Sequence, residues 1–208
     1  MVAIESAIGG GSISLQSSGR EVDCWIGVDD VSRAEDLLPN IIKMLQRNSV
    51  DRDMIDRIAV SIGPGSYTGI RIGIATALGL KDSLSIPYIG FSALEAMALS
   101  SSRSGRFMTA VPMGRDSICY QIFDVDDRPI AVAVSEPTVC KTMDERMIKQ
   151  SNLTEIIALE SILDTVQDAQ PNCPVRSLGS NIAKLIGMAS VDREGNGSLE
   201  PLFVAATV

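Results

Sequence analysis

The sequence predicts a soluble α/β protein of two lobes, each built on a mixed β-sheet flanked by helices. Strand-length apolar runs alternate with amphipathic helical stretches, which is the pattern of α/β folds. The 208 residues are 45% hydrophobic and 21% charged, which is typical of a globular chain. Glycine, proline or serine interrupts every long uncharged stretch before it could span a bilayer, so we expect no membrane contact.

Seven elements are predicted in the first lobe, in the order strand, strand, strand, helix, strand, helix, strand. The first two strands form a hairpin around a triple-glycine turn. A capping box, Ser32 with Glu35, opens the first helix, in which Pro39 predicts a kink. The predicted strands cover residues 2–8, 12–16, 21–27, 58–62 and 85–89, and the helices run from the Ser32 cap through Leu45 and over 69–82.

The second lobe repeats this pattern in a weaker and reduced form. Strands are predicted over residues 107–111, 117–124, 130–135 and 175–179, and helices over 142–151, 153–168 and 181–188. A serine-rich break at residues 99–106 separates the lobes. We therefore expect an N-terminal lobe of residues 1–103 and a smaller C-terminal lobe of residues 104–208.

Composition excludes several kinds of function. The chain has no histidine, which rules out a Ser-His-Asp triad and a histidine-liganded metal site. Its net charge of −8 makes nucleic acid a poor direct partner, so any tRNA contact is expected only through a complex. Four widely spaced cysteines and a first segment without a secretory pattern predict a cytoplasmic protein with reduced thiols.

The segment over residues 69–80 is apolar on more sides than one sheet can cover. Only Arg71 and Thr76 are polar in it, and Gly69, Gly73 and Ala77 form a stripe of small residues. We expect this stripe to pack closely against the second lobe or another chain. A helix wholly internal to a compact monomer is the alternative.

The glycine-rich loop before this helix does not match the known nucleotide-binding motifs. A Walker loop needs a lysine after its last glycine, but Ile70 follows Gly69, and Thr68 breaks the dinucleotide pattern. The same residues fit a structural turn made by Pro64 and Gly65, with Thr68 capping the helix and Tyr67 anchoring the loop.

Three motifs resemble those of the bacterial TsaB (YeaZ) family. They are AIESA near the start, RAEDLLP at residues 33–39 and SIGPGSYTGIRIG at residues 61–73. The resemblance covers residues 1–98 well and the rest faintly. The chain departs from the family pattern at four positions: Glu5, Arg33, Met113 and Ala205.

This resemblance implies an actin-like, sugar-kinase-like (ribonuclease H-like) fold and a noncatalytic accessory role. Such a subunit, possessing no cofactor of its own, supports a TsaD-type enzyme that transfers a threonylcarbamoyl group to adenosine 37 of tRNA, together with the ATPase TsaE. Metal and ATP or ADP are then expected on the partner subunits. The family's older label, glycoprotease-like or peptidase M22, does not suit a chain without histidine.

The expected partner interface lies on the first two helices, and a possible nucleotide contact lies on the loop between strand and helix. The interface residues are Leu38, Ile41, Leu45, Tyr67, Gly69, Ile70, Gly73, Ile74 and Ala77. The loop residues are Gly63, Gly65, Ser66, Thr68 and Arg71. Two other hypotheses are an independent ATP-dependent kinase or hydrolase that uses a cleft between the lobes, and a homodimer through the same helices.

Overall fold

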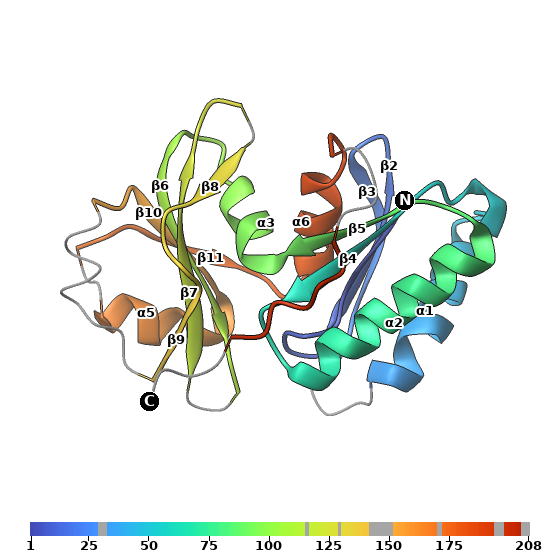
Figure 1. Ribbon diagram of the computed structural model, residues 1–208, viewed down its shortest axis with the longest axis horizontal. Coiled ribbons are helices and arrows are strands. Elements are labelled where there is room, and N and C mark those ends of the chain that lie inside the picture. Colours follow the sequence, from blue (N-terminus) through green and yellow to red (C-terminus); the bar gives the residue numbers. More distant parts are fainter. Residues whose placement is uncertain are drawn as a thin grey trace. The chain divides into compact units, whose positions relative to one another are not determined.

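The computed structural model describes residues 1–28, 33–114, 117–128, 130–141, 152–169, 172–193 and 198–204, with residues 33–35 described by their backbone alone. The chain divides into two compact units, each with its own sheet (Figure 1). Unit 1 contains Met1–Ala93 and Ser180–Leu202, and unit 2 contains Leu94–Gly179 and Phe203–Val208. The predicted fold class, mixed sheets flanked by helices, is confirmed.

Unit 1 is built on a five-stranded sheet of order β3-β2-β1-β4-β5. Strands β1, β2 and β3 form an antiparallel meander, and β4 and β5 join it in parallel to β1. The five strands are β1 (Val2–Glu5), β2 (Ser12–Ser17), β3 (Arg20–Ile26), β4 (Ile58–Gly63) and β5 (Tyr88–Ser92).

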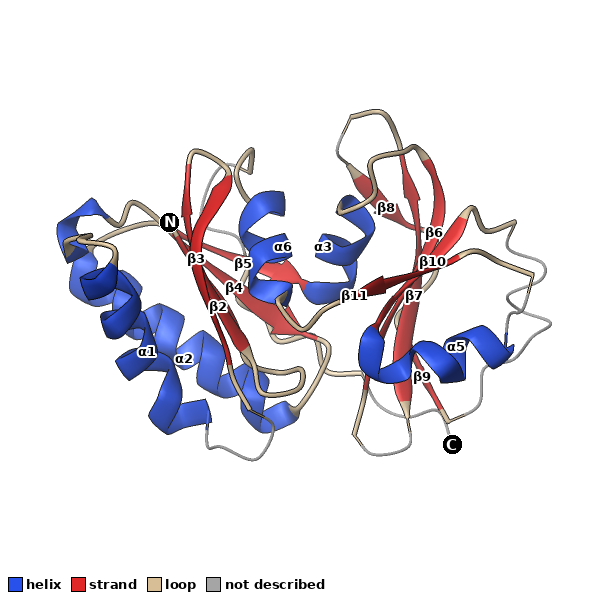
Figure 2. Cartoon of the chain, turned by 180° about the vertical axis from the view of Figure 1, so that it is seen from behind, coloured by secondary structure: helices blue, strands red, loops and turns tan. Residues whose placement is uncertain are grey.

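Helices cover both faces of this sheet. On one face, α1 (Arg33–Arg47) lies over β2 and β3, and α2 (Tyr67–Leu84) lies over β1, β4 and β5. On the other face, α6 (Ile182–Ala189) crosses β1 and β2 (Figure 2). A short 3-10 turn, η1 (Arg52–Met54), connects α1 to β4.

The sequence of β2 explains why the two faces differ. Side chains alternate along a strand. Ile13 and Leu15 therefore join the apolar core beneath α1 and α2, whereas Ser12 and Gln16 face α6. Ser12 Oγ accepts a hydrogen bond from the Ala183 N–H at 3.0 Å, and Gln16 Nε2 donates to the Lys184 carbonyl at 2.9 Å. One face is thus held by apolar packing and the other partly by hydrogen bonds.

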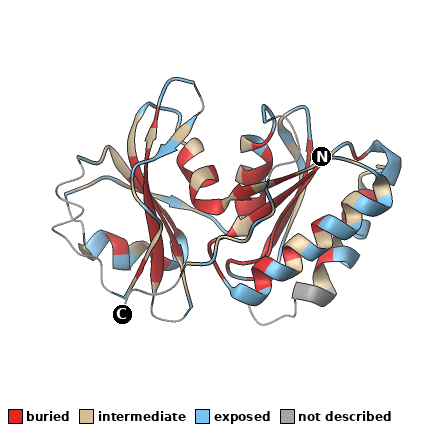
Figure 3. Cartoon of the chain, viewed as in Figure 1, coloured by how far each residue is buried: buried red, intermediate tan, exposed pale blue. Residues whose placement is uncertain are grey.

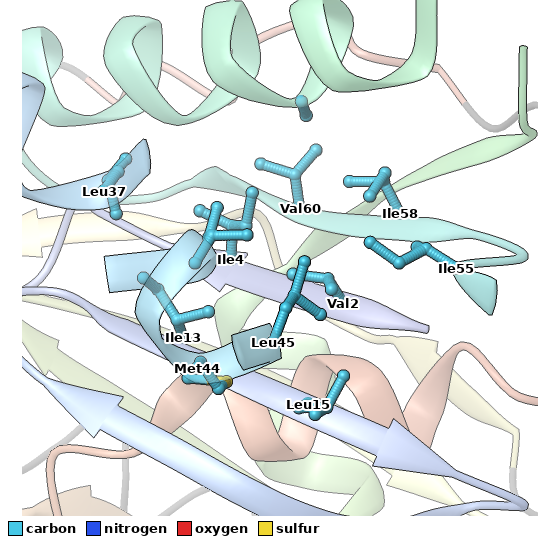
Figure 4. Close-up of a cluster of buried hydrophobic side chains, with 12 residues drawn as sticks. Val2, Ile4, Ile13, Leu15, Leu37, Met44, Leu45, Ile55, Ile58 and Val60 are labelled. Atoms are coloured by element: carbon cyan, nitrogen blue, oxygen red, sulfur yellow. The ribbon is translucent and has the colours of Figure 1, made fainter. Parts of the chain in front are cut away.

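The core beneath α1 and α2 is a single cluster of buried aliphatic side chains (Figure 4). Strands and helices both contribute to it, and Trp25 packs at its margin. Burial of one such side chain contributes roughly 1.5–3 kcal/mol. The members are Val2, Ile4, Ile13, Leu15, Leu37, Ile41, Met44, Leu45, Ile55, Ile58, Val60 and Ala77.

Unit 2 contains a six-stranded sheet in which β6 and β7 are central. The order β11-β10-β6-β7-β8 combines a parallel half with an antiparallel half, and β9 also pairs with β7. Helix α5 contacts β10 and β11. The elements are α3 (Ala93–Leu99), β6 (Gly105–Pro112), β7 (Ile118–Val125), β8 (Ala131–Ala133), β9 (Thr138–Cys140), β10 (Glu155–Leu159), η2 (Glu160–Ile162), α5 (Leu163–Ala169) and β11 (Val175–Leu178).

The structure corrects the prediction for residues 153–168. They form β10, then η2 and α5, instead of one helix. Residues 156–159 are fully apolar because β10 is a parallel strand between two others, and such a run is indistinguishable from a buried helix by periodicity. The short elements α3 and β9 were not predicted, and the helix predicted over 142–151 lies outside the described residues.

The unit boundaries also differ from the expected lobes 1–103 and 104–208. The division falls after Ala93, and Ser180–Leu202 returns to unit 1. Two contacts explain this return: α6 is hydrogen-bonded to β2, and the Leu202 N–H donates to the Ile62 carbonyl of β4 at 2.8 Å. The serine-rich segment therefore does not separate two contiguous domains.

An ion pair ties the end of α1 to β3. Arg47 donates from Nε to Asp23 Oδ2 at 2.5 Å and from its second terminal nitrogen to Asp23 Oδ1 at 2.8 Å. Hydrogen bonds from Arg47 chiefly, and from Asn48 and the Cys24 N–H, lower the pKa of Asp23 from 3.8 to about 2, against the opposing effect of burial. Asp23 is therefore ionised in the folded protein at every pH above that value.

We predict that Asp23→Asn removes an acid-sensitive part of the stability. Because the pKa of Asp23 is lower in the folded than in the unfolded chain, its contribution is complete above about pH 4 and is lost as the pH falls toward about 2. Urea unfolding of the natural protein and of Asp23→Asn across this pH range measures the contribution of Asp23 to the unfolding free energy. The difference in unfolding free energy should be constant near neutral pH and shrink on acidification, and a difference that stays constant through the acid range would contradict the assignment.

Candidate protein-interaction face

The loop before α2 packs against the connection that follows β1. The Ser66 N–H donates to the Ala7 carbonyl at 2.8 Å, and Ser6 Oγ donates to the Gly69 carbonyl at 2.8 Å. Ser66 caps α2, since its Oγ accepts from the Gly69 N–H at 3.3 Å. The predicted cap, Thr68, instead lies exposed within the first turn.

The small-residue stripe of α2 faces the protein's own sheet, which corrects the expected partner interface. A Cβ on Gly69 would collide with the backbone oxygen of Ser6 and lie 2.8 Å from Ala7 Cα. A Cβ on Gly73 would collide with Ser6 Oγ, and Ala77 is fully buried in the core. The stripe therefore lets α2 approach β1 and β4 of unit 1.

Three further residues of the expected interface are also buried inside unit 1. Ile41 and Leu45 of α1 belong to the core cluster, with 1% and 9% of their surfaces exposed. Ile70 is 1% exposed and lies beside Gly63. Their place in the core follows from helical periodicity, because each lies on the same side of its helix as Leu37 or Gly73.

The outward face of α2 carries aromatic, charged and aliphatic side chains. Figure 3 colours parts of this helix as exposed. Tyr67 is 58% exposed, and the Arg71 guanidinium lies 5.4 Å from the centre of its ring. Ala75 and Gly79 are exposed one and two turns further on, beside the exposed Leu78. Apart from Gly79, its two neighbours and the backbone of α2 itself, no atom of the described residues lies within 4 Å of the position that a Cβ on Gly79 would take.

Helix α1 adds Leu38 and Ile42 to this surface, each nearly half exposed. Arg47 reaches β3 from one flank of α1, and helical spacing places Leu38 and Ile42 on the opposite flank, next to α2. We call the exposed side chains of Leu38, Ile42, Tyr67, Ala75 and Leu78 the α1–α2 face. Ala75 and Leu78 were not predicted because the glycine stripe of α2 was assigned to the outside. Ile42 was not predicted because Ile41 and Leu45 of α1, which lie in the core, were assigned to the outside instead.

The remaining predicted residues divide between core and surface. Ile74 is partly exposed beside Leu78, and Ser66 and Arg71 are exposed at the start of α2. Gly63 and Gly65 are buried with positive φ angles of 113° and 154°, and a Cβ on Gly65 would lie 2.6 Å from the Ala7 carbonyl oxygen. The two glycines therefore shape the loop, and only its last residues reach the surface.

The described residues offer no reactive thiol or metal-binding cluster. Burial raises the pKa of all four cysteines, that of Cys119 to about 12, so each is a neutral thiol at physiological pH. No three His, Cys, Asp or Glu side chains converge as a ligand set within the part of the chain that the structure describes. No helix among the described residues is both long enough and apolar enough to cross a bilayer.

The carboxylate of Glu5 occupies the turn after β1. It is fully buried, and its Oε1 accepts the N–H groups of Ala7 at 2.5 Å and Ile8 at 2.9 Å. Amides of a glycine-rich turn can bind phosphate when they are free to donate. Here the side chain of Glu5 already accepts both N–H groups.

A family model described as TsaD, tRNA N6-adenosine threonylcarbamoyltransferase, matches residues 31–157, which is more than half of the chain. The chain belongs to this family. Within it the chain is of the TsaB (YeaZ) type, as the motif at residues 61–73 predicted.

Escherichia coli TsaB, a tRNA threonylcarbamoyladenosine biosynthesis protein, is 28% identical over 133 residues. This match covers 62% of the chain and 57% of that relative. An uncharacterised Mycobacterium leprae protein is 28% identical over 121 residues, which is 56% of this chain and 33% of that relative. The chain thus spans between about a third and just over half the length of these two curated relatives.

Solved structures share the fold over nearly the whole chain. A Pseudomonas aeruginosa protein with similarity to the peptidase YeaZ superposes with a TM-score of 0.69 at 21% identity, covering 91% of this chain and 89% of that one. A polyphosphate/ATP-glucomannokinase from Arthrobacter superposes with a TM-score of 0.53 at 12% identity, covering 91% and 96%. The TsaB-type chain therefore shares the sugar-kinase, actin-like fold.

We predict opposite effects for the same substitution at two glycines of α2. Gly69→Ala should destabilise unit 1 by about 1–3 kcal/mol or more, because the new methyl group overlaps the Ser6 backbone. Gly79→Ala should stabilise it by about 0.5–1 kcal/mol through helix propensity, since the site is open. Thermal or urea unfolding measures both, and equal effects at the two positions would contradict the packing described for α2.

Proposed function

We propose that this chain is a noncatalytic subunit that supports a TsaD-type enzyme in threonylcarbamoyl transfer to adenosine 37 of tRNA, within the cytoplasm. The observation that carries the proposal is the α1–α2 face on a chain of the TsaB type. In the proposal, TsaD docks on this face, a TsaE-type ATPase joins the assembly, and tRNA contacts the chain only as part of that complex.

The composition of the α1–α2 face suits a protein partner. It combines aliphatic side chains with Tyr67, and Arg71 lies beside it over the Tyr67 ring. Tyrosine and arginine are enriched among the residues that dominate protein–protein binding energy. Small side chains at Ala75 and Gly79 leave room for a partner's helix to approach α2 closely. The proposed interface thus uses the side of α2 opposite the glycine stripe.

The reactive side chains of the chain are consistent with a noncatalytic role. It has no histidine to ligate a metal or act as a base, and its cysteines are held as neutral thiols. Ser6, a buried hydroxyl beside the loop, donates to the Gly69 carbonyl and therefore serves the packing of α2. In the proposal, the metal ion and the nucleotide belong to the partner subunits.

Leu78→Asp should weaken binding to the cognate TsaD-type protein by about 2 kcal/mol, roughly 30-fold, because it places a charge in the apolar part of the interface. The fold should be retained, since Leu78 is already 37% exposed. Calorimetry with the partner measures the affinity, and reconstituted tRNA modification measures its consequence.

A matched control is Val132→Asp, which adds the same charge at an exposed position of β8 in unit 2. Val132→Asp should leave both the affinity for the TsaD-type protein and the reconstituted tRNA modification unchanged. Full tRNA modification in a reconstituted system from which this chain is omitted would refute the proposed function. Sedimentation of the isolated chain and of Leu78→Asp tests whether the same face also forms a homodimer when the partner is absent.

The rival hypothesis, an independent ATP-dependent kinase or hydrolase, makes a different prediction. The Glu5 side chain accepts the N–H groups of Ala7 and Ile8, so these two groups are not free to donate to a phosphate. We therefore expect no heat of binding when ATP and magnesium are titrated into the isolated chain. Saturable binding that responds to substitution in this turn would favour the rival.

A further inference from the structure

Strand β3 forms an outer edge of the unit 1 sheet. Among the described residues it pairs only with β2. Its side chains Val22 and Ile26 are 51% and 47% exposed. An edge strand with exposed apolar side chains is a template for pairing with another chain unless its backbone groups are covered.

The pairing register shows which backbone groups of β3 point outward. The Gly27 N–H donates to the Gly11 carbonyl at 2.9 Å, so Gly11 and Gly27 form a hydrogen-bonded pair. Bonded and non-bonded pairs alternate along an antiparallel ladder. Counting back through the observed register makes Ser14 and Cys24 a non-bonded pair. The N–H and C=O of Cys24 therefore point away from β2, at the middle of the free edge.

Both outward groups of Cys24 are covered by side chains of the protein itself. The Cys24 N–H donates to Asp23 Oδ1 at 2.8 Å, and the Cys24 carbonyl accepts from Arg47 at 3.0 Å. Arg47 also binds both oxygens of Asp23, and Asn48 donates to Asp23 as well. We call Asp23, Arg47 and Asn48 the Cys24 clasp.

We propose that the Cys24 clasp closes a strand-pairing edge, and that its removal lets β3 pair with β3 of a second copy of this chain. The sequence of β3 is self-complementary about Cys24. In a two-fold antiparallel pair centred on Cys24, Val22 of each copy lies opposite Ile26 of the other, which brings the exposed apolar side chains together. This inference is independent of the proposed function, because the clasp lies on the flank of α1 away from α2.

The test compares self-association of the full chain with and without the clasp. Arg47→Ala removes the donor to the Cys24 carbonyl and the ion pair together. The Arg47→Ala protein should self-associate at concentrations at which sedimentation equilibrium shows no self-association of the natural sequence. Amide hydrogen exchange should show the Cys24 N–H protected in the associated form. An unchanged association state in a folded Arg47→Ala protein would overturn the proposal.

A matched control removes an equivalent ion pair from the interior of a sheet. Arg106 donates to both oxygens of Asp124, at 2.7 and 2.8 Å, but β6 lies between β10 and β7. Arg106→Ala should therefore leave the association state unchanged, and association of equal strength in this variant would count against an edge mechanism.

A second substitution tests the route of association. Ile26→Lys places a charge on the exposed edge and, added to Arg47→Ala, should restore the original state. Association that persists in the double variant would overturn pairing through β3. If Arg47→Ala folds poorly, Arg47→Met keeps the aliphatic stem and removes only the charge and the donors, so the same comparison can be made.

Discussion

The close approach of α2 to the β1–β2 connection is the constraint on which the architecture of unit 1 depends. Gly69 and Gly73 bring the helix backbone against Ser6, and the Ser6 hydroxyl fixes the contact by donating to the Gly69 carbonyl. This distance sets the depth of the aliphatic core beneath α1 and α2 and turns Tyr67 and Leu78 outward. One packing contact thus determines both the interior of the unit and which side chains of α2 are exposed.

Much of the fold could be predicted from the sequence, because unit 1 is built from elements with clear local signals. The hairpin of β1 and β2 follows from its glycine turn and the alternation of β2, and α1 and α2 follow from their periodicity. Strand β10 could not be predicted, because a strand buried on both faces loses the alternation that identifies it. The return of α6 to unit 1 depends on long-range hydrogen bonds that no local pattern reveals.

The sequence predicted helices α1 and α2 but not which side of each faces the protein's own core. A helix that is apolar all round shows that two sides need cover, yet it does not show which side the chain itself covers. The glycine stripe was assigned to a partner because small residues permit close approach, and this argument holds equally for the protein's own backbone. The contact with Ser6 shows that the stripe faces the protein's own backbone. Ser6 lies 63 positions before Gly69 in the sequence, so no local pattern reveals this contact.

The polar layer beneath α6 bears on how the chain is made. Ser12 and Gln16 lie in β2, and the helix α6 whose backbone they bind follows them by 171 and 168 positions. During synthesis the α6 side of the unit 1 sheet therefore stays uncovered, with its hydroxyl and amide groups solvated by water, until Leu94–Gly179 of unit 2 has been translated. Unit 1 is thus completed only after this part of unit 2 is made, and a ribosome that stalls before α6 releases a nascent chain in which one face of the first sheet still lacks its helix.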